Sequence, residues 1–414
     1  MTDSHNPAAD DVRMRGFARR DTVEAALAWV DRQVRPLDGE TVPLAEAPGR
    51  VLAAAVASSI DVPGFDRATM DGYGVVAENT DGATAYNSLP LSLVGESLPG
   101  RPFDGSMRNG QAVRIMTGAP IPAGCDAVLP AEFVQLEGDV VRALSPMSPG
   151  KNIGRRGEDV ARGTTLFEAG RVLRPQDLGV LSSIGVGKVA VFRRPRVRLI
   201  VTGNELLPAG SQPQGSCIAD ANGPMLAALV ERDGGVVDFP GIIRDERDAI
   251  LAALQSPADV VIVSGGSSVG IEDHAPMLLA KHGELAIHGI AMRPSSPTGM
   301  GRLENRIVFL LPGNPVSCLC AYDFFAGRAI RLLGGRPPAW PHRTKPGVLT
   351  RKLASAVGRV DYCRVRCADD QVEPLALSGA SILSSTTRAD GFVIVPAESE
   401  GYGPGTPVVV YLYE

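Results

Sequence analysis

The stretch from Asp259 to His274, DVVIVSGGSSVGIEDH, combines an apolar run with a loop that could bind an anion. The continuous β-branched run at 260–263 is typical of a strand buried on both faces. Three glycines and three serines follow within seven residues, so their backbone N–H groups can lie close to a phosphate. Glu272 and Asp273 then open the predicted next helix. The pattern fits two hypotheses equally: a phosphate site whose rim carboxylate binds a divalent cation, or a glycine-rich turn without a ligand.

A second junction, Leu311 to Ser317, also stops a predicted strand and starts a helix. Asn314 is a natural N-cap and Pro315 a natural first helical residue, so a well-made helix start explains the stretch on its own. The same geometry offers free N–H groups and the Ser317 hydroxyl to an oxyanion.

The elements that must position these loops follow a regular order from residue 196 onward. Three strands are predicted at 196–203, 235–243 and 259–266, with helices at 222–232 and 245–255 between them. A helix to about 282, extended segments near 285–291 and 307–311, and a helix over 314–333 follow. This alternation predicts a doubly wound, mostly parallel α/β domain. Ligands of such sheets bind beyond the carboxyl ends of the strands, where Thr202–Glu205, Arg244–Asp245 and the glycine-rich loop fall.

The rest of the chain predicts a multidomain α/β protein. A capping box at Asp21–Glu24 begins a helix that we expect to pack on another part of the molecule or on a second copy. Proline, glycine and short apolar runs after residue 60 predict a small β-rich domain. The predicted division is a disordered leader, 1–16; a helical linker and dimerisation region, 17–60 and 151–192; a β-rich domain, 61–150; the α/β domain, 193–336; and a C-terminal β-barrel, 337–414.

Composition restricts the class of protein. The 414 residues are 44% hydrophobic and 21% charged, which is ordinary for a soluble globular protein. A net charge of −5 argues against a nucleic-acid-binding surface, and the pattern of apolar runs predicts neither a membrane span nor a signal peptide. The six cysteines lack the histidines of a zinc site and are too few for a disulfide framework, so we expect free thiols and a cytoplasmic location.

Several motifs occur in one order along the chain: DVPGFDRATMDGYGV, RIMTGAPIPAGCDAV, NIGRRGEDV, TGNEL, GIIRDERD, VSGGSSVGIED and LPGNPVS. Together they closely resemble the molybdopterin molybdenumtransferases, the MoeA family that includes the gephyrin E domain. The resemblance, which runs from about residue 22 to the C-terminus, implies insertion of molybdate into adenylylated molybdopterin with release of AMP. It also implies a divalent cation, here taken as Mg2+, and a homodimer whose cleft lies between the α/β domain of one subunit and the β-rich domain of the other.

The resemblance carries over to individual positions. Asp71 and Thr117 would reach across the dimer, and Glu205, Asp245 and Asp273 match the acidic strand-end positions that would act in catalysis and hold the metal. Two or three convergent carboxylates suit Mg2+, which would neutralise charge as a pyrophosphate is cleaved. The expected pterin-binding residues are those of the two loops: Ser264, Gly265, Gly266, Ser267, Ser268, Gly270, Pro312, Gly313, Asn314 and Pro315.

The chain departs from the family at the molybdate positions. The usual Lys-Pro-Gly-Lys-Pro is Arg293-Pro-Ser-Ser296-Pro here, so one cation has become an arginine and the other is lost. Where the family has a Ser-His pair, this chain has Ala380-Ser381. TGNEL replaces the commoner Thr-Gly-Asp-Glu-Leu, with Asn204 in place of a carboxylate. The expected molybdate residues are Arg293, Ser296, Ser317, Arg359, Arg364 and Ser381.

These departures leave alternatives to the transferase. One is a divergent, non-catalytic paralogue that carries molybdopterin or docks a molybdoenzyme or its chaperone; retention of the acidic set counts against it. The other is a molybdopterin adenylyltransferase, which shares the glycine-rich loop. The β-rich, linker and barrel regions fit that alternative poorly, because the related enzyme is a single α/β domain. The sequence does not choose between molybdate and tungstate.

Overall fold

The structure, a computed structural model, describes residues 20–266, 274–376 and 379–413. The chain forms two compact units, one made of residues 1–40, 49–53 and 190–414 and the other of residues 41–48 and 54–189. Strands β1 (Gly39–Pro43) and β12 (Lys188–Phe192) carry the chain across the boundary between them. The five-part division made from the sequence stays a prediction.

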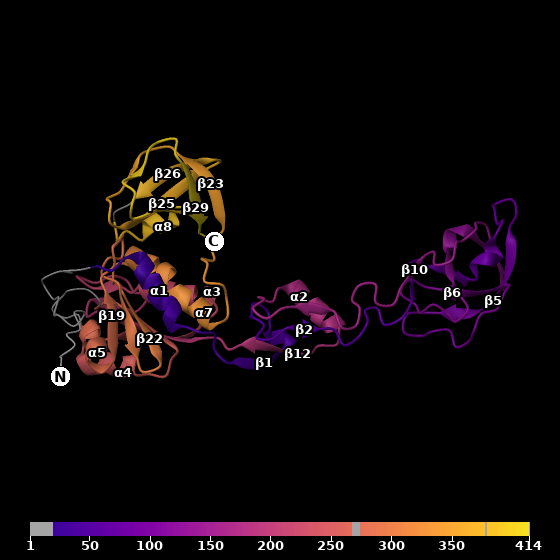
Figure 1. Cartoon of the computed structure of the whole chain (residues 1–414), viewed down its shortest axis with the longest axis horizontal. Helices are drawn as coiled ribbons and strands as arrows, with labels where there is room; N and C mark the ends of the chain where they lie inside the picture. Colours follow the sequence, from indigo (N-terminus) through magenta and orange to yellow (C-terminus); the bar gives the residue numbers. More distant parts are fainter. Residues whose placement is uncertain (1–19, 267–273, 377–378, 414) are drawn as a thin grey trace. The chain divides into compact units, whose positions relative to one another are not determined.

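The first unit contains the predicted mostly parallel sheet (Figure 1). Its strand order is β16-β13-β18-β22-β21-β19, with β17 also paired to β13. Among the described strands of this sheet, β21 alone runs in the direction opposite to the others. The strands are β13 (Arg196–Thr202), β16 (Val236–Asp238), β17 (Ile242–Ile243), β18 (Val260–Ser264), β19 (Glu284–His288), β21 (Gly299–Leu303) and β22 (Arg306–Leu311).

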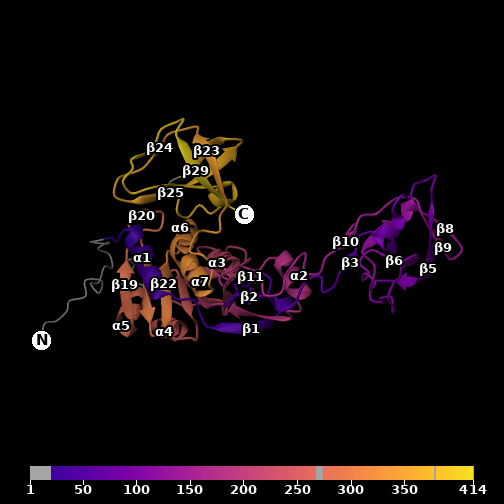
Figure 2. The ribbon, with the colours of Figure 1, turned by 45° about the vertical axis from the view of Figure 1, so that its right-hand side comes forward.

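Helices cover both faces of this sheet because its central strands are apolar throughout. Leu199, Ile262 and Phe309 point to one face, into a core shared with α1 (Val23–Gln33), α3 (Asn222–Arg232) and α7 (Gly327–Leu333). Alternate residues of the same strands point to the other face and pack against α4 (Arg247–Leu254) and α5 (His274–His282). Figures 1 and 2 show α4 and α5 on one side of the sheet and α1 and α7 on the other.

Three predicted elements differ in detail. The predicted strand 235–243 is split into β16 and β17, because Pro240 offers no N–H to a ladder and Gly241 has a φ of +102°. The predicted helix 245–255 begins at Arg247, which leaves Asp245 in the loop after β17. The predicted helix 314–333 is continuous but contains a π-helical turn, between α6 (Pro315–Ala321) and α7, at Tyr322–Ala326.

Helix α1 begins one residue later than the sequence predicts. The side chain of Thr22 accepts a hydrogen bond of 3.1 Å from the backbone N–H of Ala25, so Thr22 is the N-cap and the predicted capping box at Asp21–Glu24 is wrong. Val23, Ala26 and Val30 are buried in the core of the first unit, which confirms that the helix packs on another part of the chain.

The C-terminal part of the first unit is the predicted barrel. Its strands close in the order β25-β26-β23-β29-β27, because β27 also pairs with β25. The barrel strands are β23 (Thr344–Leu349), β25 (Val360–Ala368), β26 (Gln371–Ala376), β27 (Gly391–Val395) and β29 (Pro407–Leu412). β20 (Met292–Arg293) joins β25 in parallel and so attaches the barrel to a loop of the α/β sheet. The smaller elements are β24 (Leu353–Ala354), β28 (Gly401–Tyr402) and α8 (Ser384–Thr387).

The second unit contains the predicted β-rich domain. Its sheet has the order β7-β4-β6-β5-β9-β8. The strands are β4 (Gly72–Val75), β5 (Leu89–Ser97), β6 (Gln111–Ile115), β7 (Ala127–Pro130), β8 (Val134–Glu137) and β9 (Val140–Ala143). The linker elements of this unit are the paired strands β2 (Val56–Ala57) and β11 (Thr165–Phe167), the paired strands β3 (Arg67–Ala68) and β10 (Ile153–Gly154), and α2 (Pro175–Ser183).

Within the described residues, none of the helices has the length and apolar character needed to cross a membrane.

Candidate active site

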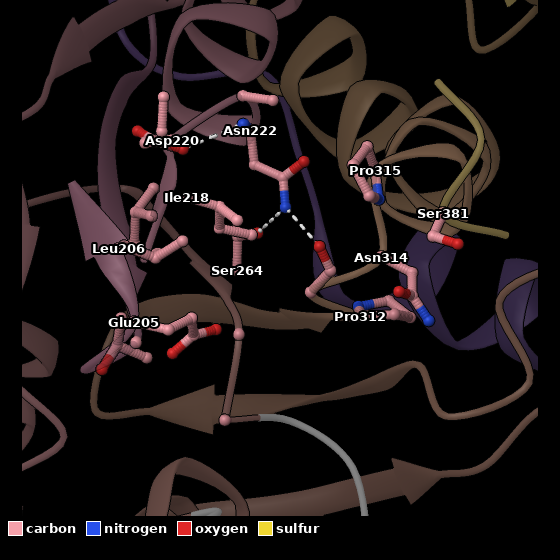
Figure 3. A pocket seen from close by; sticks show the side chains of 18 of the residues that line it. Glu205, Leu206, Ile218, Asp220, Asn222, Ser264, Pro312, Asn314, Pro315 and Ser381 are labelled. Atoms are coloured by element: carbon pink, nitrogen blue, oxygen red, sulfur yellow. Dashed lines mark hydrogen bonds between the residues drawn. The ribbon is translucent and has the colours of Figure 1, made fainter. Parts of the chain in front are cut away.

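A pocket of about 570 Å³ lies where β13, β18 and β22 end in the first unit (Figure 3). The parallel pairing of these strands brings their carboxyl ends to one edge of the sheet, the usual ligand position in such folds. The pocket collects two of the predicted carboxylates and parts of both predicted loops. The predicted residues that line it are Glu205, Asp245, Ser264, Gly265, Gly266, Pro312, Gly313, Asn314, Pro315 and Ser381.

Asp245 is oriented at this pocket by neutral donors. One carboxylate oxygen accepts a hydrogen bond from the Thr202 hydroxyl, and the other accepts one of 3.2 Å from the backbone N–H of Asn204. Glu205 is exposed and lines the same pocket. Because hydroxyl and amide donors orient a carboxylate without cancelling its charge, Asp245 stays available to a cation.

The two loops approach each other closely, and glycine is required at position 265. Gly265 has a φ of +93°, and a Cβ atom built on it would lie 2.3 Å from the carbonyl oxygen of Thr202. A Cβ on Gly313 would lie 3.5 Å from the Cα of Gly265. Glycine at position 265 therefore lets the backbone after β18 pass beside β13, and the N–H of Gly265 donates a 3.4 Å hydrogen bond to the carbonyl oxygen of Leu311 at the end of β22.

Asn222, at the start of α3, ties these loops together and was not singled out from the sequence. Its side-chain amide donates hydrogen bonds of 2.9 Å to the Ser264 hydroxyl and 2.8 Å to the Gly313 carbonyl oxygen (Figure 3). The carboxylate of Asp220, which also lines the pocket, accepts from the backbone N–H groups of Asn222 and Gly223 at 2.9 Å each. A D-x-N pattern just before a predicted helix is the signal that could have identified both residues.

Part of the predicted site lies outside the described residues. This holds for Ser267, Ser268 and Gly270 of the glycine-rich loop, and for Asp273. Among the residues that are described, no three His, Cys, Asp or Glu side chains form a group able to hold a metal ion. Mg2+ often needs only one or two protein carboxylates beside substrate phosphates, so Glu205 and Asp245 fit such a cation.

Asp71 and Thr117 lie in the second unit and bind each other. The Asp71 carboxylate accepts two hydrogen bonds of 2.7 Å, from the Thr117 N–H and from its hydroxyl. These two donors hold the pKa of Asp71 below its ordinary value. The predicted pair is therefore present as a pair, whereas its position relative to the pocket stays a prediction.

The predicted molybdate residues are spread over several environments. Arg293 and Arg359 both pair with Asp361, a fully buried carboxylate that also accepts a 2.8 Å hydrogen bond from the Ser355 hydroxyl. Sequence reasoning missed Asp361, although its place in β25 opposite Arg293 of β20 follows from the strand pairing. Arginines that share a buried carboxylate have less charge to offer an oxyanion.

The remaining members of that set differ in accessibility. Ser317 is buried in α6, where its carbonyl oxygen accepts a 2.6 Å hydrogen bond from Ser295. The Ser296 hydroxyl is also buried and has no hydrogen-bond partner among the described residues. Arg364 is fully buried in the barrel, and Ser381 lines the pocket.

Three family models match separate parts of the chain. They describe the MoeA N-terminal region (domain I and II) over residues 21–185, a probable molybdopterin binding domain over 198–331, and the MoeA C-terminal region (domain IV) over 346–413. Together they extend over the linker, β-rich, α/β and barrel regions.

Relatives match along nearly the whole length. A molybdopterin molybdenumtransferase of Haemophilus influenzae is 35% identical, covering 91% of this chain and 94% of its own. Molybdopterin molybdenumtransferase 2 of Mycobacterium tuberculosis is 34% identical, covering 94% of this chain and 98% of its own. The crystal structure of a molybdopterin biosynthesis MoeA protein from Pyrococcus horikoshii matches with a TM-score of 0.82 and 32% identity, over 96% of this chain and 100% of that one. The chain therefore belongs to the MoeA family of molybdopterin biosynthesis proteins.

Proposed function

We propose that this protein is a molybdopterin molybdenumtransferase of molybdenum cofactor biosynthesis, which cleaves AMP from adenylylated molybdopterin and transfers molybdenum to the pterin. The observation that supports this most strongly is the convergence of Glu205, Asp245 and the two glycine-bearing loops on one pocket. Relatives that are named for this activity match over more than nine tenths of the chain. Matches to MoeA N- and C-terminal regions favour this function over a single-domain adenylyltransferase.

In the proposed reaction, the chain's own residues bind and orient the pyrophosphate. The N–H of Gly266, which lines the pocket, would donate to a phosphate, and the bond from Asn222 to Gly313 fixes the neighbouring loop. Thr202 holds Asp245 with its charge directed to the same cavity. A bound Mg2+ would supply neutralisation of the charge that develops on the leaving phosphate, and Glu205 and Asp245 would hold it.

The proposal extends to assembly and location. We infer a homodimer in which the Asp71–Thr117 pair of one subunit serves the pocket of the other, on the basis of the family resemblance. Asp273 would complete the acidic set. A cytoplasmic location fits six cysteines that form no disulfide.

The test is incubation of the full chain with adenylylated molybdopterin, Mg2+ and molybdate, while AMP release and protein- or pterin-bound molybdenum are both measured. If the protein is the transferase, we expect AMP and bound molybdenum in equal amounts. AMP without bound molybdenum would indicate an altered insertion step, in line with the pairing of Arg293 and Arg359 to Asp361. Pterin binding with neither product would mean a carrier or scaffold role instead.

A further inference from the structure

The loop between β20 and β21, residues 294–298, contains a buried serine with an unusual backbone conformation. Ser295 is 2% exposed and has a φ of +86°, in the left-handed region that residues with a Cβ atom rarely adopt. Glycine, which stands at this position in the family's usual Lys-Pro-Gly-Lys-Pro, adopts such a φ without strain. Serine therefore introduces backbone strain that glycine would avoid.

The surroundings of Ser295 differ from those of other residues with a positive φ. Glu304 and Asp369, with φ of +54° and +50°, are exposed in the turns between β21 and β22 and between β25 and β26, where such values are ordinary. Ser295 lies in the protein interior, where a strained conformation persists only if its contacts hold it in place.

Backbone hydrogen bonds hold the shape of the loop itself. The carbonyl oxygen of Ser295 accepts from the N–H of Thr298 at 3.0 Å and from the hydroxyl of Thr298 at 2.7 Å. The carbonyl oxygen of Ser296 accepts a 2.8 Å hydrogen bond from the N–H of Ile290. These bonds connect the loop to its own neighbours in the sequence.

The side chain of Ser295 makes a contact of a different kind, because it joins the loop to α6. Its hydroxyl donates a 2.6 Å hydrogen bond to the carbonyl oxygen of Ser317, which is 4% exposed. A hydroxyl in this position requires a Cβ atom on the left-handed residue. The strain at Ser295 thus accompanies a bond that glycine could not make.

Both ends of this hydrogen bond lie close to the pocket at the ends of β13, β18 and β22, the strand-end pocket. Pro297, two residues after Ser295, lines that pocket. Pro315, two residues before Ser317, lines it as well (Figure 3). The bond therefore connects two parts of the pocket wall that are distant in the sequence.

We propose that Ser295 is a positioning residue of the strand-end pocket, which fixes the wall at Pro297 relative to the wall at Pro315 through its hydrogen bond to α6. A wall held in place binds a rigid ligand better, because less freedom is lost on binding. The proposal deepens the proposed function, on which the identity of the pterin nucleotide rests.

The test measures the dissociation constant of adenylylated molybdopterin for the full chain by isothermal titration calorimetry, without Mg2+ and molybdate. KM and kcat of AMP release are measured with both present. Ser295→Ala removes the bond and keeps the strain, whereas Ser295→Gly removes both. Each variant should weaken binding and raise KM roughly fivefold, with kcat changed by less than about twofold. Ser295→Gly should nevertheless unfold at a higher temperature than Ser295→Ala, because glycine adopts this φ freely.

Thr298→Val is the matched control, because it removes a buried hydroxyl bond of similar length that stays inside the loop. It should lower the melting temperature and bind the nucleotide like the wild type. Wild-type affinity in both Ser295 variants would overturn the proposal, and so would an equal loss of affinity in Thr298→Val. A loss in Ser295→Ala alone would also overturn it, because the backbone strain and not the bond to α6 would then set the affinity.

The proposed function is judged separately, by AMP release from the wild type. If the wild type binds the nucleotide, both Ser295 variants lose affinity and no AMP is released, the positioning role stands and the transferase is lost. If the wild type releases AMP while both variants keep its affinity, the transferase stands and the positioning role is lost.

Discussion

The strand-end pocket and the junction between sheet and barrel hold charged side chains in opposite ways. In the pocket, Asp245 accepts hydrogen bonds from the Thr202 hydroxyl and the Asn204 N–H, both neutral. At the junction, Asp361 is fully buried and paired with Arg293 and Arg359. Neutral donors orient a charge and leave it for a ligand, whereas an ion pair largely cancels it. The comparison indicates that the pocket is arranged for binding and the junction for structure.

The largest expected effect follows from removing the pocket's oriented charge. Asp245→Asn keeps the size of the side chain and its place beside Thr202, but it removes the negative charge that a cation requires. We expect AMP release to fall roughly 100-fold or more, as for loss of a main electrostatic group in an active site. The measurement is the single-turnover rate of AMP release. Asp248→Asn is the control, since Asp248 is an exposed carboxylate of α4 that does not line the pocket. If Asp245→Asn released AMP as fast as this control, Asp245 would have no part in the reaction.

Loss of the ion pairs at the junction between sheet and barrel should lower the free energy of unfolding. Asp361→Asn leaves Arg293 and Arg359 without their buried counter-charge, which we expect to cost about 2 kcal/mol, less than for a fully buried pair because each arginine is about one third exposed. Differential scanning calorimetry should show the main transition lowered by roughly 4–8 °C.

Glu373→Gln is the matched control for that variant, because Glu373 belongs to an exposed pair with Arg351. Its effect should stay below about 0.5 kcal/mol. If Asp361→Asn kept its stability and bound molybdate more tightly, the junction arginines would be an oxyanion site that Asp361 restrains, and the distinction between the two regions would fail.

A smaller effect is expected at the residue that joins the pocket's loops. Asn222→Ala removes hydrogen bonds to Ser264 and Gly313, each worth about 1 kcal/mol. We expect KM for the pterin nucleotide to rise roughly tenfold with a much smaller change in kcat, because the loops hold the substrate but do not react. Asn305→Ala, in the exposed turn between β21 and β22, should change neither constant. A fall in kcat at constant KM would assign Asn222 a different role.

The sequence predicted the α/β sheet because its strands are continuous apolar runs, and their parallel order places their ends at one edge. That is why Glu205, Asp245 and the two loops were predicted together and are found together. The D-x-N pattern at 220–222 could have marked Asn222 as part of a helix start, but nothing local shows that its side chain reaches two distant loops. Asp361 was missed for a related reason: it lies in a barrel strand, and its partner Arg293 lies in β20, far away in the sequence.

The break between β16 and β17 has a local cause that could have been found. Phe239-Pro240-Gly241 interrupts an otherwise β-branched stretch, and a proline inside a run argues against a single central strand.

The smallest expected effect concerns Asp71, where two neutral donors again orient a carboxylate. Both bonds favour the charged form, so the pKa of Asp71 lies below its ordinary value in the folded protein. The stability that these bonds contribute is present above the unfolded-state pKa and is lost as pH falls through the folded-state pKa. Thr117→Val removes the hydroxyl and keeps the N–H donor. The pKa of Asp71 should therefore rise part of the way toward its ordinary value. As the pH falls, the stability that the remaining bond contributes should be lost at a higher pH than in the wild type.

Carboxyl-detected NMR titration of Asp71 measures this shift directly. Thr117→Ser keeps the hydroxyl and should leave the pKa of Asp71 depressed as in the wild type. An equal rise in both variants would mean that packing of the threonine methyl group, and not its hydroxyl, sets the environment of Asp71. A rise in Thr117→Val alone would show that the threonine hydroxyl, and not its methyl group, holds Asp71 in its charged form.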